Sequence, residues 1–422
     1  MRLPKNMDVK RTLQTQSPSH RQSRSAEPQL QISRSALIHN IRLIRGELHP
    51  GTKICAMVKA NAYGHGADVI VDALCNFEYI PNSPPPRPSP GVPGEVETAP
   101  MVEQLAVGSL DEADTLIETS LPVLVLRAVE NVYIGQHRHA IEHALRNGWT
   151  LTIGTGSAAD DVARIAIAIQ KRANVHVMLD SGMTRCGCAV EHLPELLGRI
   201  EGHSALRLVS LGTHLATSEV TGSSFVPQQF ARFRAATDEF VAQRGGKIIR
   251  HVANSGGIFF WPKTHLDMVR PGISIYGIDP TCKPNFNRPL RPVAKWTAPI
   301  ISILDAAKGA TVGYGQTWRA PRDTRIGLIP VGYADGYQRA WSNQAMMLVH
   351  RTPVPVVGRV SMDLTTIDLH DVPAAQIGDE VTIMDNDPLS PASPYALAEL
   401  GQTIPYEVFT RIGSRVKRVA VE

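Results

Sequence analysis

The feature that most constrains the fold of this chain is a regular alternation of strand and helix patterns between about residue 30 and residue 287. The predicted strands are QLQIS (29–33), KICAMV (53–58), QLAV (104–107), PVLVL (122–126), LTIG (151–154), NVHVML (174–179), LRLVSL (206–211), IIRHV (248–252) and LDMVR (266–270). Helices are predicted after Ser33 and over 109–119, 157–171 and 227–244. Such alternation is typical of parallel βα units. About eight units in about 250 residues fit a closed (β/α)8 barrel, which we expect over 29–287.

Two further sequence features define the rest of the architecture: the absence of a dinucleotide-binding glycine motif and a change of pattern at residue 288. An open doubly wound sheet is the alternative, but no GxGxxG follows the first strand, which favours the barrel. From residue 288 onwards the sequence has short β-type runs such as "WTAPIISIL" and "EVTIM", separated by turns. We therefore expect a fold of the α/β class, in which a barrel precedes a mainly-β domain over 288–422.

Two segments fall outside this pattern. Residues 1–28 are rich in Ser and Gln and poor in apolar residues, which predicts a disordered basic extension. The stretch "PNSPPPRPSPGVPGEVETAP" (81–100) is dense in proline, so it is incompatible with a helix and too long for an ordinary connection. We interpret this second segment as an exposed loop inserted between two barrel units, at about 80–100.

Charge and cysteine content limit the classes of partner. The formal net charge of the 422 residues is +4. Residues 1–25 alone carry +5, from Arg2, Lys5, Lys10, Arg11, Arg21 and Arg24 against Asp8, which leaves −1 for the rest of the chain. The near-neutral remainder argues against nucleic acid as a partner. The five cysteines have no framework or metal-site spacing, so we expect free thiols. Without an apolar run of roughly 18 residues or a signal peptide, we expect no membrane association and a cytoplasmic location.

Polar residues stand at the end of successive predicted barrel strands. They are Lys59 in "VKANAYGHG", Arg185 in "DSGMTRCG", His214 in "GTHLA", Asn254 and Ser255 in "ANSGG", and Arg270 in "VRPGIS". Taken singly, a lysine or arginine at such a position is more often an exposed surface residue, and a histidine is more often a core residue with its hydrogen bonds made. Because the carboxyl ends of barrel strands meet at one mouth, their shared position predicts a single site.

The last two barrel units favour a phosphate group. "NSGG" offers a hydroxyl and a flexible backbone at the start of a helix, and the loops after strands 7 and 8 are the usual phosphate site of this fold. A lysine at the same mouth suggests a Schiff base to a phosphorylated carbonyl compound. A sugar-phosphate aldolase fits these features as well as a cofactor-dependent enzyme does.

The motifs resemble those of the alanine racemases. "VKANAYGHGA", "DSGMTRCG", "THLA", "ANSGG", "VRPGISIYG", "VGYGQTW", "VGYADGYQRA", "GRVSMD" and "IPYEV" occur in the order typical of that family and cover about 30–420. The resemblance implies a barrel with a C-terminal β domain, pyridoxal 5′-phosphate as cofactor and a homodimer. It implies interconversion of L- and D-alanine, with D-alanine supplied to bacterial peptidoglycan.

The resemblance also assigns residues to the cofactor. It implies that Lys59 binds pyridoxal 5′-phosphate as a Schiff base and that Arg270 faces the pyridine nitrogen, with His214 supporting Arg270. The residues matching those that hold the phosphate are Tyr63, Ser255, Gly272, Ile273 and Tyr406, and Asn254 is also assigned to cofactor binding. Arginine can only donate a hydrogen bond, so we expect the ring nitrogen to stay unprotonated and the cofactor to favour simple reprotonation.

Racemisation needs a base on each face of Cα. By resemblance these are Lys59 and Tyr314, and Tyr314 comes from the β domain of the other subunit. Met362 and Asp363 match residues of the partner chain that receive the substrate carboxylate, and Arg185 matches the residue that contacts this carboxylate and the phenolic oxygen of the cofactor.

One departure from the family pattern concerns Arg185. Many members carry a carbamylated lysine that steadies this arginine, and Met178 occupies its position here, so another group must orient Arg185. Three alternatives to an alanine racemase remain: a racemase of broad specificity, a barrel-type decarboxylase, and a non-catalytic cofactor-binding protein. The β domain lacks the cysteine–acid motif of the decarboxylases, and the binding protein lacks a β domain altogether.

Overall fold

The computed structural model describes residues 27–75, 101–130, 135–285 and 287–422. The predicted basic extension, apart from residues 27 and 28, and the proline-rich insert lie outside these residues. The described chain forms two compact units. One comprises Arg34–Arg291, and the other comprises the residues up to Ser33 together with Pro292–Val421.

The first unit is a closed barrel, as predicted. Among the described residues, eight parallel strands form it: β2 (Lys53–Met57), β3 (Gln104–Val107), β4 (Val123–Val125), β5 (Thr150–Ile153), β6 (Ala173–Asp180), β8 (Leu206–Gly212), β9 (Ile249–His251) and β10 (Met268–Val269). Each strand pairs with its sequence neighbour in the barrel, and β10 returns to β2 with Met268 opposite Lys53. This pairing closes the sheet and excludes the open doubly wound alternative. The two-residue strand β7 (Cys188–Ala189) pairs in parallel with the last two residues of β6.

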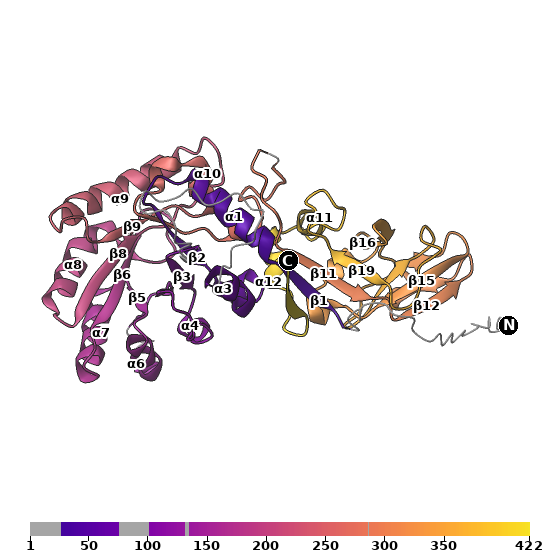
Figure 1. Cartoon of the computed structure of the whole chain (residues 1–422), viewed down its shortest axis with the longest axis horizontal. Coiled ribbons are helices and arrows are strands. Elements are labelled where there is room, and N and C mark those ends of the chain that lie inside the picture. The colour runs from indigo at the N-terminus through magenta and orange to yellow at the C-terminus, as the bar shows by residue number, and fades with distance from the viewer. Residues whose placement is uncertain (1–26, 76–100, 131–134, 286) are drawn as a thin grey trace, which may run out of the picture. The chain divides into compact units, whose positions relative to one another are not determined.

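Helices cover the outside of the barrel (Figure 1). They are α1 (Arg34–Glu47), α3 (Ala67–Cys75), α4 (Leu110–Asp114), α6 (Arg138–Arg146), α7 (Gly156–Ala168), α8 (Leu193–Gly202), α9 (Phe225–Ala242) and α10 (Ser255–Phe260). The short segment α2 (Lys59–Tyr63) is a turn with left-handed backbone angles that follows β2. The barrel strand β5 is buried along its whole length, as expected for a strand covered on both faces, and its two threonines are buried with its leucine and isoleucine. The helices are amphipathic because only one side of each packs on the barrel.

The second unit consists mainly of strands. Its largest sheet contains β1 (Gln29–Ser33), β11 (Ala294–Pro299), β16 (Met346–Val349), β17 (Thr352–Pro355), β19 (Glu380–Met384) and β20 (Lys417–Val421). Smaller sheets contain β12 (Ser302–Ala306), β15 (Thr324–Ile329) and β18 (Thr365–Asp368), and β13 (Thr311–Val312) with β14 (Trp318–Arg319). Two short helices follow, α11 (Pro394–Leu400) and α12 (Pro405–Thr410).

One sequence prediction was wrong. The strand 29–33 was assigned to the barrel, but β1 lies in the β unit, antiparallel to β11 and parallel to β20. Its residues alternate between buried and half-buried, as expected for a sheet with one covered face, whereas barrel strands are buried on both faces. The alternation Gln-Leu-Gln-Ile-Ser already carried this signal.

Candidate active site

The structure brings the five predicted polar positions of the barrel to one mouth. Lys59 follows β2, Arg185 follows β6, His214 follows β8, the Asn254–Ser255 pair follows β9, and Arg270 follows β10. In a closed parallel barrel these points lie at the same end. The alternation of strands and helices in the sequence was therefore enough to group them.

Lys59 begins a turn with an unusual backbone. Residues 60–63 all have φ between 52° and 53°, which is the left-handed region. L-residues pay about 1 kcal/mol each for this conformation, so the turn needs support from its surroundings. Gly64 and Gly66 continue it at φ 83° and 94°, where glycine carries no such cost.

Glu112, which was not among the site residues predicted from the sequence, supplies part of that support. Its Oε1 accepts the backbone N–H of Ala60 at 3.0 Å, and its Oε2 accepts the N–H of Gly108 at 2.6 Å. The Ser109 hydroxyl in turn accepts the N–H of Glu112 at 3.3 Å. The serine-to-glutamate spacing in "SLDE" was the available signal, because it is typical of a helix start. Glu112 thus ties the turn after β2 to the turn after β3.

The amine of Lys59 lies in an electropositive and partly buried setting. Burial lowers its pKa below the usual value, and the positive charges of Arg185 and Arg270 lower the pKa further, while Glu112 opposes them. A larger fraction of this amine is therefore neutral near physiological pH than in an exposed lysine. A neutral amine can attack a carbonyl carbon or accept a proton.

Arg270 is buried and held on two sides. Its Nη1 donates to the carbonyl of His251 at 2.6 Å and contacts His251 Nδ1, and its Nη2 donates to the carbonyl of Thr213 at 2.6 Å. Nη2 also lies 3.5 Å from Nδ1 of His214, the residue predicted to contact it. Its Nε has no hydrogen-bond partner among the described residues. Burial lowers the pKa of Arg270 to about 10, so it stays charged at neutral pH.

The histidines around Arg270 are neutral. Burial and the charge of Arg270 lower the pKa of His214 to about 3 and the pKa of His251 well below its usual value. His176 stacks on His251 with ring centroids 4.6 Å apart, and its pKa is also lowered, to about 3. Neutral rings can accept from the guanidinium without repelling it. His251 and His176 lie within strands, where no motif distinguished them from ordinary core residues.

The start of α10 forms a polar cradle. The Asn254 side chain caps the helix by accepting the N–H of Gly257 at 3.0 Å. The Ser255 hydroxyl accepts the N–H of Gly272 at 3.0 Å and the hydroxyl of Ser274 at 2.9 Å. Backbone N–H groups and hydroxyls at a helix start are suited to a phosphate. The residues predicted after the last two barrel strands, β9 and β10, therefore lie in contact at this cradle.

Tyr63 joins this cradle from the turn that begins at Lys59. A Cβ added to Gly272 would lie 2.4 Å from the Tyr63 hydroxyl, so only glycine permits the approach. The ring of Tyr63 lies 5.1 Å from that of Tyr276, whose hydroxyl donates to the carbonyl of Met57 at 2.8 Å. Ile273 follows Gly272 and is buried.

Arg185 stands on an exposed loop. Asp180 Oδ1 accepts the N–H groups of Gly182 and Thr184 at 2.8 and 3.0 Å, which shapes the loop. Arg185 itself makes no hydrogen bond or ion pair with any residue that the structure describes. Met178 is buried on β6 and offers no charged partner.

The remaining predicted residues lie in the β unit. Tyr314 begins a 3₁₀ turn and is 72% exposed, and Met362 is 55% exposed. Asp363 pairs with Arg415 at 2.8 Å, and Tyr406 lies on α12. Their roles at the active site stay predictions.

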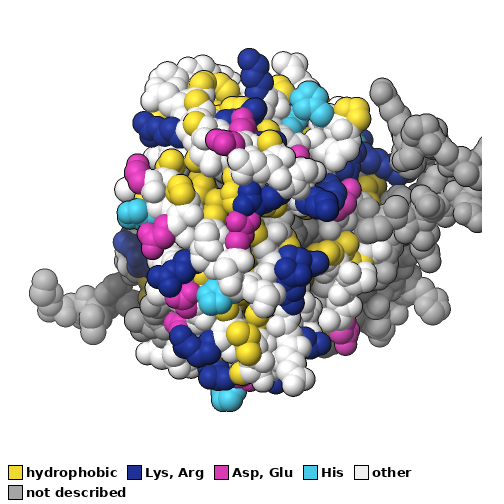
Figure 2. Space-filling view, turned by 90° about the vertical axis from the view of Figure 1, so that its left-hand side faces the viewer, with side chains coloured by type: hydrophobic (Ala, Val, Ile, Leu, Met, Phe, Trp, Pro, Cys, Tyr) yellow, Lys and Arg dark blue, Asp and Glu magenta, His cyan; other side chains and the backbone are white. Residues whose placement is uncertain are grey.

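Other kinds of site receive little support. Within the described ranges, no group of three or more His, Cys, Asp or Glu could hold a metal ion. The same residues include no helix long and apolar enough to cross a bilayer. Figure 2 shows basic and acidic side chains interspersed on one face, without a continuous patch of one sign. The five cysteines are free, as predicted.

A barrel whose mouth holds a lysine of lowered pKa, a buried arginine and a polar cradle suited to a phosphate fits the class of (β/α)8-barrel enzymes that act through a lysine amine on a phosphate-bearing carbonyl compound. Comparison with known proteins specifies the family. The model for the "Alanine racemase, N-terminal domain" matches residues 32–78 and 94–280, and that for the "Alanine racemase, C-terminal domain" matches 293–420. The chain belongs to the alanine racemase family.

Individual alanine racemases align with nearly the whole length of this chain. An alanine racemase of Desulfovibrio desulfuricans is 35% identical over 93% of this chain and 97% of its own length. One of Chlorobaculum tepidum is 33% identical over 96% and 100%. The solved alanine racemase of Clostridium difficile superposes with a TM-score of 0.81 at 28% identity, covering 94% of this chain and 96% of its own. That of Bartonella henselae, with covalently bound pyridoxal phosphate, has a TM-score of 0.76 at 25% identity, covering 94% and 100%.

Proposed function

We propose that this protein interconverts L- and D-alanine with pyridoxal 5′-phosphate, by two bases that act on opposite faces of Cα. The observation that carries the proposal is Lys59, an amine of lowered pKa that lies at the same barrel mouth as a phosphate-type cradle. The product D-alanine would serve peptidoglycan synthesis in the cytoplasm.

The cofactor fits the residues present. The Ser255 hydroxyl, the loop at Gly272 and the Tyr63 hydroxyl would hold its phosphate, joined by Ile273 and Tyr406. Arg270 would direct its free Nε toward the ring nitrogen, and His214 and His251 keep the guanidinium in place. When bound, pyridoxal 5′-phosphate supplies a ring that withdraws electrons and acidifies the Cα–H bond of the amino acid.

The chain's own groups then control the proton. The Lys59 amine holds or accepts a proton on one face of Cα, and its lowered pKa makes this possible near neutral pH. The hydroxyl of Tyr314 serves the other face. Arg185 and Met362 position the substrate carboxylate, and Asp363 helps to fix that region through its ion pair with Arg415.

We further propose that Tyr314, Met362 and Asp363 act in the active site of a second copy of the chain. The support is their exposure, because Tyr314 and Met362 are 72% and 55% exposed in the isolated chain. This exposure leaves both side chains accessible to a partner chain. A homodimer with shared sites follows.

The test of the reaction is a chiral exchange assay. Purified protein loaded with cofactor is incubated with L-alanine and, separately, with L-serine, L-lysine and L-arginine, and each D-enantiomer is quantified. Alanine turnover far above the rest supports the proposal. Comparable turnover of the larger amino acids indicates a racemase of broad specificity, and absence of any D-product refutes racemisation.

The test of the shared site is complementation between two inactive variants. Lys59→Ala and Tyr314→Phe chains are mixed, dissociated and reassociated. If each site takes Lys59 from one chain and Tyr314 from the other, mixed dimers regain one intact site, and roughly a quarter of wild-type activity returns. If both residues act within one chain, mixing restores nothing.

A further inference from the structure

A cavity of about 450 Å³ lies at the end of the barrel opposite Lys59. Its lining includes the first or second residue of each barrel strand: Lys53, Gln104, Val123, Thr150, Asn174, Arg207, Ile249 and Met268. The active-site residues follow the other ends of the same strands. The cavity is therefore separate from the site described above, and its volume falls within the range of small-molecule pockets.

The charges of this cavity are predominantly positive. Three charged residues line it, namely Lys53, Arg207 and Glu103. Arg45 neutralises Glu103 by contacting both of its carboxylate oxygens, at 3.0 and 3.1 Å, and the N–H of Ile54 donates to the same group at 2.7 Å. Neither Lys53 nor Arg207 has an ion pair with a described residue. Two positive charges thus remain for a ligand.

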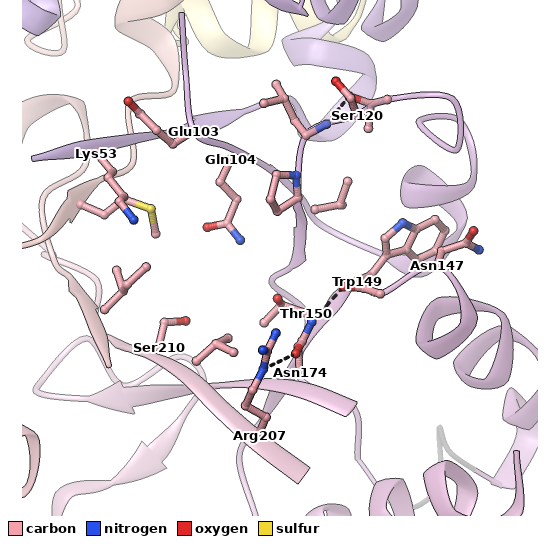
Figure 3. A pocket seen from close by; sticks show the side chains of 18 of the residues that line it. Lys53, Glu103, Gln104, Ser120, Asn147, Trp149, Thr150, Asn174, Arg207 and Ser210 are labelled. Atoms are coloured by element: carbon pink, nitrogen blue, oxygen red, sulfur yellow. Dashed lines mark hydrogen bonds between the residues drawn. The ribbon is translucent and has the colours of Figure 1, made fainter. Parts of the chain in front are cut away.

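Figure 3 shows how the polar side chains surround the open space. Arg207 uses its Nε to donate to Asn174 Oδ1 at 2.8 Å, which fixes the guanidinium and leaves its two Nη groups available. Gln104, from β3, presents an amide to the same space. Arginine held in this way is suited to bidentate binding of a carboxylate.

The spacing of the two cations selects the kind of anion. Lys53 begins β2 and Arg207 lies in β8, and β9 and β10 stand between these strands. Neighbouring strands lie about 4.8 Å apart, so the two cations are better matched to two separate anionic groups than to one compact phosphate. The wall also contains Leu121, Trp149 and Met268, which can pack against a short hydrocarbon chain.

We propose that this cavity binds a small organic dicarboxylate, with one carboxylate at Lys53 and the other at Arg207. The ligand lies outside the racemase site, so its binding and the racemase reaction are separate properties. Occupancy ties together strands from opposite parts of the barrel and stabilises the folded protein by mass action.

The test is calorimetric titration of the full-length, cofactor-loaded protein with succinate, in the absence and in the presence of saturating L-alanine. Succinate is expected to bind equally in both conditions. The affinity of the Lys53→Gln/Arg207→Gln protein for succinate is expected to be lower by a factor of at least about ten, because two charge-assisted contacts are lost. The control is Lys171→Gln/Lys247→Gln, which removes two exposed positive charges from the same unit and is expected to bind like the wild type.

Three results would overturn the proposal. Succinate binding that L-alanine abolishes would place the ligand in the substrate site. Equal affinity of the cavity variant and the wild type would show that Lys53 and Arg207 do not hold the ligand. Binding of inorganic phosphate or butyrate as tightly as succinate would contradict the requirement for two separated carboxylates. Chiral assays on both double variants are expected to show wild-type activity, which separates this test from that of the proposed function.

Discussion

Glu112 Oε1 accepts the backbone N–H of Ala60, the residue that follows Lys59, at 3.0 Å. The same carboxylate holds the N–H of Gly108 at 2.6 Å. One side chain therefore bridges two barrel loops and supports a run of left-handed residues that is unfavourable on its own. Lys59 immediately precedes the first residue held by this carboxylate.

We predict that Glu112→Ala weakens cofactor binding and kcat/KM about tenfold or more, since loss of a charged acceptor leaves two N–H groups unpaired. Glu112→Gln should do less harm, because its amide oxygen can still accept one of them. Absorbance titration with pyridoxal 5′-phosphate and the chiral assay measure the two effects. Glu118→Gln, at an exposed position nearby, is the control. Equal behaviour of Glu112→Ala and this control would show that the turn holds its conformation without Glu112.

The charges around Lys59 predict opposite pH shifts for two variants. Its pKa is lowered by burial and by Arg185 and raised by Glu112, so the neutral amine forms below the usual pH for lysine. Arg185→Gln should raise the pKa, and Glu112→Gln should lower it. The rate at which cofactor-free protein captures pyridoxal 5′-phosphate should therefore have its midpoint at higher pH in the first variant and at lower pH in the second. Shifts in the same direction would contradict the charge assignment.

Gly272 predicts a steric effect. A Cβ at this position would lie 2.4 Å from the Tyr63 hydroxyl, so Gly272→Ala must displace the tyrosine from the cradle. We expect cofactor affinity to fall at least about tenfold, with a smaller effect on thermal stability. Gly198→Ala on α8 is the matched control, because an added Cβ there meets nothing within 4 Å. Unchanged cofactor affinity in Gly272→Ala would argue against Tyr63 as a phosphate ligand.

The position of β1 predicts how much of the N-terminus can be removed. Deletion of residues 1–25 should leave activity intact, because no motif lies there. Deletion through Ser33 removes a strand that lies between β11 and β20 and buries Leu30 and Ile32. We expect the longer deletion to abolish the cooperative thermal unfolding of the β unit, as followed by calorimetry. Equal melting of the two deletions would contradict a structural role for β1.

The sequence alone predicted the two-part architecture and grouped the residues that follow the barrel strands at one mouth. Repeated βα units require a parallel sheet, and closure of that sheet gathers the residues after each strand, so Lys59, His214, Ser255 and Arg270 could be grouped without coordinates. Motif resemblance then pointed to the alanine racemases, and the comparisons confirmed this family.

Only the tertiary structure decided what surrounds each of these groups. Glu112, His251 and His176 act through contacts between strands and loops far apart in the chain, and their sequence surroundings resemble ordinary core or helix-start patterns. The left-handed turn after Lys59 depends on such contacts, since local propensity opposes it. The assignment of β1 to the β unit has the same origin, because pairing with β11 and β20 decides which sheet a short strand joins.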